Sequence, residues 1–203
     1  MDLKKHAREV GSALRSGRFQ PTGDGRVHIT TAMNVVLGGA FKHTLHRADG
    51  SVDAAIDPNM LVGEGINAII NAFFHQGTQP AAFYVSIFKG NANPADGWTA
   101  ANYDANADEF TAYNGVQTVR PQWVIGAQAT TTKTVGNSGS EAMFQFNAGG
   151  PYNLYGAAIH TTAPKEDNTG ILVAATRFAT PRLNQIAGDK LGIEYVLTGQ
   201  DAG

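Results

Sequence analysis

Apolar side chains recur at helical spacing in Asn59–His75, which is the clearest pattern in the chain. The repeat predicts one helix whose broad apolar stripe packs on a core, and Gly77 and Pro80 are expected to end it. The stripe consists of Leu61, Val62, Ile66, Ile69, Ile70 and Phe73. Directly afterwards, Ala82–Phe88 alternates with the period of a strand and is largely apolar on both faces. This predicts a strand that is covered on both sides.

Shorter alternating runs fill most of the remaining chain. Ala40–Arg47 and Val52–Ile56 flank the turn sequence ADGS and predict a β-hairpin, with Phe41, His43 and Leu45 on one side. Residues 27–36 fit either a strand or a loop. Further short strands are expected at 110–113, 116–119, 122–125, 142–146, 154–160, 170–178, 183–186 and 190–197. Together with 24 glycines, which imply many turns, this indicates a mainly β protein. We expect a β-sandwich or jelly-roll-like body with one packed helix at about residues 59–75.

The N-terminal segment has a different character. Asp2–Ser16 predicts a short amphipathic helix, and Gly17–Arg26 has the glycine and proline of a linker. We therefore divide the chain into an N-terminal basic arm, residues 1–26, and a β-rich body, residues 27–203. A lone helix of this length is marginal in water, so we expect it to dock on the body, to dock on a partner or to fray. The arm residues expected to contact a partner are Leu3, Lys4, Ala7, Arg8, Val10, Leu14, Arg15 and Arg18.

The segment Asn91–Asn106 lacks usable periodicity and predicts a long surface loop. It contains Trp98 and Tyr103, and aromatic side chains of this kind are favoured anchors of protein interfaces. We therefore add these two residues to the expected partner contacts. The alternative is that they belong to the core or to its rim.

Composition narrows the class of protein. The chain contains no cysteine, which excludes disulfides and thiolate chemistry. Charged residues make up only 16% of the chain, which favours a β-rich surface that packs against neighbours over the charge-rich surface of a soluble enzyme. No apolar run is long enough to span a membrane, and the N-terminus lacks the apolar region of a secretory signal. We therefore expect a cytoplasmic protein or a component of a particle assembled there.

Charge is distributed unevenly along the chain. Residues 1–47 contain eight Lys or Arg and three acids, a net charge of +5 in a chain of net charge −2, so the remainder carries −7. A basic arm of this kind suits an acidic partner, either a neighbouring subunit or nucleic acid, although an ordinary solvated helix also fits. Within the body, Arg120 and Arg182 each neighbour a proline and are expected to pair with acids across strands as structural contacts.

Signals for catalysis and for cofactors are weak. The motif Gly63-Glu64-Gly65 lacks the other residues of a phosphate-binding loop, and an acid beside a helix N-terminus explains it better. His43 and His46 lie on opposite faces of their strand, and the acidic run 104–109 lacks the glycine and the distal glutamate of a calcium loop. No nucleophile motif or pair of carboxylates stands out. We therefore expect no enzyme activity, no cofactor and no metal site.

Several stretches of the chain together show a family likeness. Asn59–Asn71 (NMLVGEGINAIIN) leads into Phe83–Gly90 (FYVSIFKG), followed later by Arg120–Trp123 (RPQW) and by Gly170–Leu197, which includes the motifs TPR and GDKL. This arrangement resembles virion structural proteins of tailed bacteriophages, in which a helix runs into an aromatic strand and similar strands close the fold. The resemblance extends over residues 41–197.

The resemblance implies a non-enzymatic β-rich subunit used in many copies in the virion and made in the host cytoplasm. Our first expectation is a capsid decoration or cement protein that binds the shell of the major capsid protein. Its arm would reach across to a neighbouring subunit, so that the protein forms a homo-oligomer in the particle. The second is a neck or tail accessory subunit, which includes a host-binding one, present in few copies.

An alternative of another class is a carbohydrate-binding β-sandwich module, in which Trp98 and Tyr103 stack on sugar rings. Nucleic acid is a less favoured partner of the arm, and no membrane partner is expected. No catalytic residues come with the resemblance.

Overall fold

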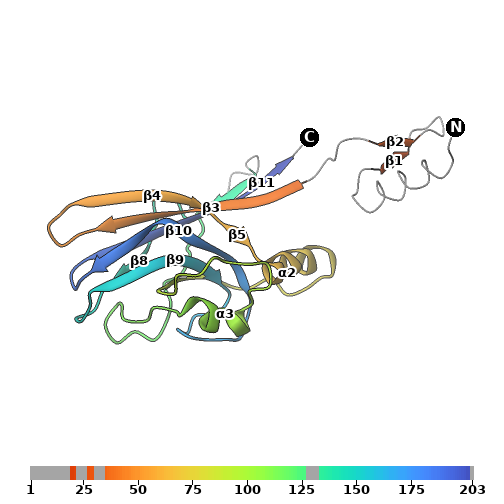
Figure 1. The fold of residues 1–203 in the computed structure, drawn as a ribbon. Helices are drawn as coiled ribbons and strands as arrows, with labels where there is room; N and C mark the ends of the chain where they lie inside the picture. Colours follow the sequence, from red (N-terminus) through yellow and green to blue (C-terminus); the bar gives the residue numbers. More distant parts are fainter. Residues whose placement is uncertain (1–18, 22–26, 30–34, 127–132, 202–203) are drawn as a thin grey trace. The chain divides into compact units, whose positions relative to one another are not determined.

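The protein is described here from a computed structural model (Figure 1), and the described residues are 19–21, 27–29, 35–126 and 133–201. The chain separates into two compact units, residues 1–37 with 199–203 and residues 38–198. In the first unit, β1 (Phe19–Pro21) pairs antiparallel with β2 (Val27–Ile29). Residues 19–21, expected to belong to a linker, are thus a strand. The predicted amphipathic helix and its contact residues, from Leu3 to Arg18, lie outside the described residues.

The second unit is built on two β-sheets. One sheet has the order β5 (Met60–Leu61), β10 (Leu172–Gln185), β9 (Tyr152–His160) and β6 (Tyr84–Phe88). The other has the order β4 (Val52–Pro58), β3 (Val35–His46), β11 (Lys190–Asp201) and β7 (Thr134–Gly136), and β8 (Ala142–Gln145) also pairs with β11. Two helices, α2 (Gly63–Phe74) and α3 (Ala100–Ala107), complete the described structure. The expected mainly β, sandwich-like body with a helix beside its sheet is confirmed.

The β3–β4 hairpin follows the predicted pattern closely. The two strands pair in register from His46 with Val52 to Ala40 with Pro58. Gly50 closes the turn with φ of +86°, in the left-handed region that glycine tolerates best. Its backbone N–H donates to the carbonyl oxygen of Arg47 at 3.0 Å. Alternation within β3 buries Phe41, His43 and Leu45 on one face, as expected.

Apolar side chains form two clusters. The larger one contains inward-facing residues of both sheets and is rich in aromatic rings, among them Phe41, Phe110, Trp123, Phe144, Phe178 and Tyr195. The smaller cluster lies between the β6–β9–β10 sheet and α3, and it contains Phe88, Trp98, Ala100, Tyr103 and Ala107. All four residues Val85–Phe88 of β6 are buried, so this strand is covered on both faces as predicted.

The prediction of a surface loop at residues 91–106 is wrong in its second half. A capping box starts α3: the Thr99 side chain accepts from the Asn102 backbone N–H, and the Asn102 side chain accepts from the Thr99 N–H. Such a box satisfies N–H groups that a helix start leaves unpaired. The helix was missed because its apolar residues are mostly alanines, whose periodicity is weak. Trp98 and Tyr103 are buried, with only 6% and 1% of their surface exposed.

Several element boundaries differ from the predicted ones. The helix expected from residue 59 begins at Gly63, because Met60–Leu61 instead pairs with β10. Residues 183–185 extend β10 rather than forming a separate strand. Residues 110–113, 116–119 and 122–125 form only isolated bridges, at Tyr113, Val119 and Gln122. Trp123 nevertheless points inward, as predicted.

Candidate functional site

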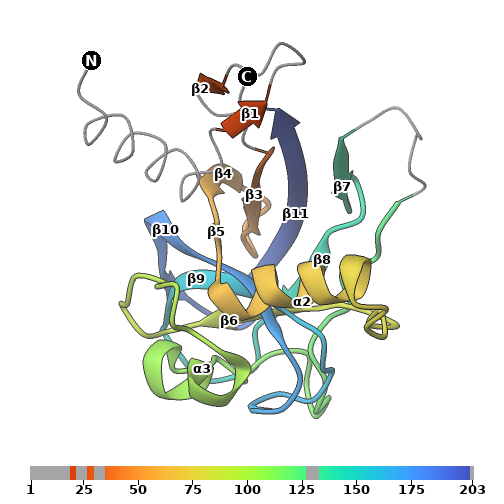
Figure 2. The same cartoon turned by 90° about the vertical axis from the view of Figure 1, so that its right-hand side faces the viewer.

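Helix α2 is attached to the body through its backbone and one carboxylate. Gly65 is its buried residue, and a Cβ atom there would lie only 2.2 Å from the carbonyl oxygen of Val173. Glu64 stands in the first turn, as the sequence suggested, and its Oε2 accepts from the backbone N–H groups of Ala100 at 2.8 Å and Leu172 at 2.7 Å. The start of α2 is therefore held against α3 and β10 (Figure 2).

The apolar stripe of α2 is only partly covered. Leu61 and Val62, which precede the helix, are buried, whereas Phe73 and Phe74 are 80% and 73% exposed and Ile66 and Ile70 also lie at the surface. The expectation that the whole stripe packs on the core is therefore wrong. Because contiguous exposed apolar patches mark interaction sites, this face is a candidate for contact with another molecule.

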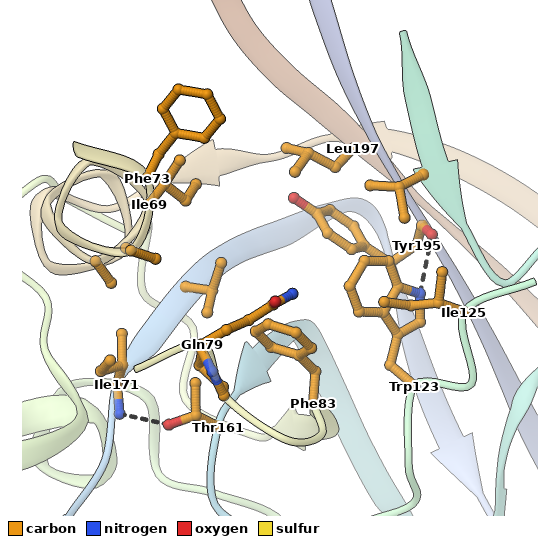
Figure 3. A pocket seen from close by; sticks show the side chains of 16 residues that line it. Ile69, Phe73, Gln79, Phe83, Trp123, Ile125, Thr161, Ile171, Tyr195 and Leu197 are labelled. Atoms are coloured by element: carbon orange, nitrogen blue, oxygen red, sulfur yellow. Dashed lines mark hydrogen bonds between the residues drawn. The ribbon is translucent and has the colours of Figure 1, made fainter. Parts of the chain in front are cut away.

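A cavity of about 390 Å³ opens beside the same helix. Figure 3 shows Ile69 and Phe73 of α2 on one side and Phe83, Trp123, Tyr195 and Leu197 around the remainder. The other lining residues are Gly65, Ala68, Ala72, Gln79, Pro80, Ile125, Val135, Thr161, Ile171 and Val173. We call this cavity, together with the exposed residues Ile66, Ile70, Phe73 and Phe74, the α2 groove.

Trp123 and Thr161, at the wall of the groove, have hydrogen-bond partners within the protein. Trp123 Nε1–H donates to Asn137 Oδ1 at 3.0 Å and to the carbonyl oxygen of Tyr195 at 3.1 Å. Thr161 Oγ1 accepts from the Ile171 backbone N–H at 2.9 Å. Burial raises the pKa of the Tyr195 hydroxyl, so this group is neutral at physiological pH. None of the described lining residues is charged. The groove therefore suits apolar side chains.

A buried cluster joins Ser86, Tyr103 and His160. Ser86 Oγ lies 2.8 Å from His160 Nε2 and 2.7 Å from the Tyr103 hydroxyl. A serine next to a histidine is the pairing that nucleophilic catalysis uses. Here both side chains have no exposed surface, and His160 Nδ1 has no hydrogen-bond partner to orient the ring. This cluster thus links β6, β9 and α3. Its sequence signal is Ser86, a polar residue in an otherwise apolar buried strand.

A second buried cluster connects three strands. Arg182 Nε donates to His43 Nδ1 at 2.8 Å, so His43 Nε2 must hold the ring proton and donate to Asp57 Oδ2, also at 2.8 Å. Arg182 additionally bonds the Asp53 carboxylate. The expected pairing of Arg182 with an acid across strands is confirmed. These contacts join β3, β4 and β10 in the core.

Of the predicted contact residues, only Trp98 and Tyr103 are described, and they meet in the core rather than at the surface. Trp98 and Tyr103 belong to the smaller core cluster, where Trp98 packs edge-to-face on Phe88 and Tyr103. They are therefore not surface anchors, nor are they free to stack on a sugar ring. The groove was missed because the stripe was assigned to the core. The adjacent residues Phe73 and Phe74 could have indicated an exposed apolar face. Neighbouring positions of a helix point about 100° apart, so both rings cannot pack into one narrow contact.

Neither the described structure nor the comparisons with known proteins give a further indication of function. In the described part of the chain, neither helix has the length and apolar character needed to cross a membrane. The described His, Asp and Glu side chains form no group of three or more suited to holding a metal ion. No protein-family model matches the chain, and no curated protein is significantly similar to it.

Proposed function

We propose that the protein is a non-enzymatic structural subunit of a phage particle, namely a capsid decoration or cement protein that binds the shell of the major capsid protein. The observation that supports this most is the α2 groove, in which two large exposed aromatic side chains stand beside an apolar cavity. Buried aromatic anchors surrounded by apolar surface provide most of the binding energy in protein interfaces.

The stretches that resemble phage virion proteins also build this groove. Asn59–Asn71 provides Gly65, Ala68 and Ile69, and Phe83–Gly90 begins at the lining residue Phe83. The RPQW motif ends at Trp123, another lining residue. The last stretch provides Ile171, Val173, Tyr195 and Leu197. These stretches thus provide part of one apolar surface, although Phe73 and Phe74 lie outside them, and this placement supports a role in assembly.

The proposal is tested by attachment to shells that lack the protein. The double variant Phe73→Asp/Phe74→Asp should fold, because both side chains are exposed, but should lose attachment. Burial of each phenylalanine contributes about 1.5–3 kcal/mol, so the loss should be near complete. The matched control is Val116→Asp, which alters a side chain that is 98% exposed and does not line the groove. Circular dichroism checks that each variant is folded.

Quantitative mass spectrometry of purified particles then gives the copy number. Many copies per particle together with loss of attachment in the double variant support a decoration protein. A low copy number would assign the subunit to the neck or tail instead. Full attachment of the folded double variant would contradict the proposal.

A further inference from the structure

We propose that the α2 groove of one subunit receives the N-terminal segment, residues 2–16, of a second copy of this chain. The inference rests on the proposed function, because an assembly subunit present in many copies offers each groove a neighbouring segment. The occupant of the groove is then a neighbouring copy, and shell attachment would depend on Phe73 and Phe74 because the link between neighbouring copies holds the proteins together on the shell.

The apolar patterns of segment and groove match in length. In helical form, the stripe from Leu3 to Leu14 extends about 16 Å, and the exposed apolar face of α2 from Ile66 to Phe74 extends about 12 Å, at 1.5 Å per residue. A helix of the length of residues 2–16 is marginal in water unless its apolar side is covered. An amphipathic helix laid into an apolar groove is an established mode of recognition that satisfies both partners.

Charge favours the same pairing. Residues 2–16 contain four Lys or Arg and two acids, a net charge of +2. Residues 38–198 contain nine Lys or Arg and thirteen acids, a net charge of −4. Helix α2 itself has no Lys or Arg, and the exposed Asp96 stands at its start, with a carboxylate oxygen 3.1 Å from the Cβ position of Gly63. The basic segment is therefore attracted to the acidic second unit as a whole, and it meets no like-charged side chain on α2.

The linkage is of the head-to-tail kind, since each subunit donates a segment and accepts another. Such heterologous contacts either close into a ring or continue over a surface. Because Phe19 pairs with Ile29, the β1–β2 hairpin adds little reach, and the span comes mainly from the eight residues 30–37, which cover up to about 27 Å at about 3.4 Å per residue. This reach is sufficient for the segment to arrive at a neighbouring subunit.

Cysteine cross-linking of the full-length chain tests the proposal in solution, without the shell. The chain contains no cysteine, so each introduced thiol is unique. Leu14→Cys and Ile70→Cys are made in separate chains of different mass, mixed at high concentration and oxidised. In the control, the Leu14→Cys chain is mixed with a Val116→Cys chain. We expect at least about tenfold more mixed disulfide between Leu14→Cys and Ile70→Cys than in this control, because docking raises the effective concentration of the two thiols.

The outcomes separate this inference from the proposed function. A mixed disulfide no more abundant than in the control contradicts the inference, while shell attachment that depends on Phe73 and Phe74 would still support a decoration protein. A second experiment places both cysteines, Leu14→Cys and Ile70→Cys, in one chain. A disulfide within the dilute monomer, in place of the mixed product, would show that the groove is filled by its own segment and would overturn the link between copies. The mixed product without shell attachment would support the docking and contradict the decoration role.

Discussion

Arg120 and Glu109 form a buried, two-pronged ion pair. Arg120 Nε donates to Glu109 Oε1 at 2.9 Å and Nη2 donates to Oε2 at 2.6 Å, and neither side chain has exposed surface. Arg120 also donates to the carbonyl oxygen of Thr162, and Glu109 Oε2 accepts from the Glu166 backbone N–H. The pair therefore holds the segment before Pro121 against the loop that follows β9.

Removing the arginine should be costly because the glutamate stays behind. Arg120→Met leaves Glu109 buried without a counter-charge, and breaking such pairs typically costs about 3–5 kcal/mol. The double variant Arg120→Met/Glu109→Gln should recover much of this loss, because no buried charge is left unpaired. Urea unfolding of the two single variants and the double variant measures the coupling. Simply additive free energies would contradict the assignment.

The close approach of α2 to β10 should make Gly65 intolerant of any side chain. Alanine favours helices over glycine by about 1 kcal/mol, yet the Cβ of Gly65→Ala would collide with the Val173 backbone. We expect a net destabilisation of about 1–3 kcal/mol, as for overpacked sites. Gly97→Ala is the matched control, because no atom lies within 4 Å of its Cβ position, and its effect should be small. Equal unfolding midpoints for both variants would argue against this contact.

Two buried histidines should make the protein sensitive to mild acid. Burial lowers the pKa of His43, aided by the charge of Arg182, and burial lowers the pKa of His160 further below its ordinary value, aided by Arg120. Below about pH 6.5 these two histidines become protonated in the unfolded chain but stay neutral in the folded protein until the pH is lower. Stability should therefore fall as the pH drops from 6.5 towards 5, by up to about 1.4 kcal/mol per pH unit for each histidine.

Urea unfolding between pH 7.5 and 5 measures this slope. His160→Gln removes one of the two groups, so the slope of this variant should be clearly shallower than that of the natural chain. An unchanged slope would show that His160 takes up its proton equally in both states.

Trp98 should behave as a core residue. Its ring contacts Phe88 and Tyr103 edge-to-face, with centroid separations of 6.1 and 6.3 Å. Trp98→Ala should destabilise the fold by about 3–5 kcal/mol, the usual cost of removing a large buried aromatic side chain. Thermal unfolding tests this. A variant of unchanged stability that loses binding would restore the interface interpretation of Trp98.

The alternation of apolar residues and the turn sequences were sufficient to predict much of the strand arrangement. Alternation predicted that Phe41, His43 and Leu45 of β3 are buried together, because successive side chains of a strand point to opposite sides wherever the strand lies. In β11 it identified Leu191, Ile193 and Tyr195, but residues 191–195 are buried on both faces. The ADGS turn determined the β3–β4 pairing, since a short turn brings its flanking strands into register. Arg120 and Arg182, each beside a proline, were expected to pair with acids, and both do, but the sequence did not identify those acids.

Only the tertiary structure decided what covers each apolar face. The period of α2 shows that Ile66, Ile70 and Phe73 share one side, but exposure depends on where the helix is anchored. Gly65 and Glu64 hold it against partners more than thirty residues away in the chain, namely Val173, Leu172 and Ala100. The burial of Trp98 and Tyr103 likewise depends on β6 and β9, which the 91–106 segment does not encode. Periodicity defines faces, whereas contacts between distant segments determine which faces remain free to bind.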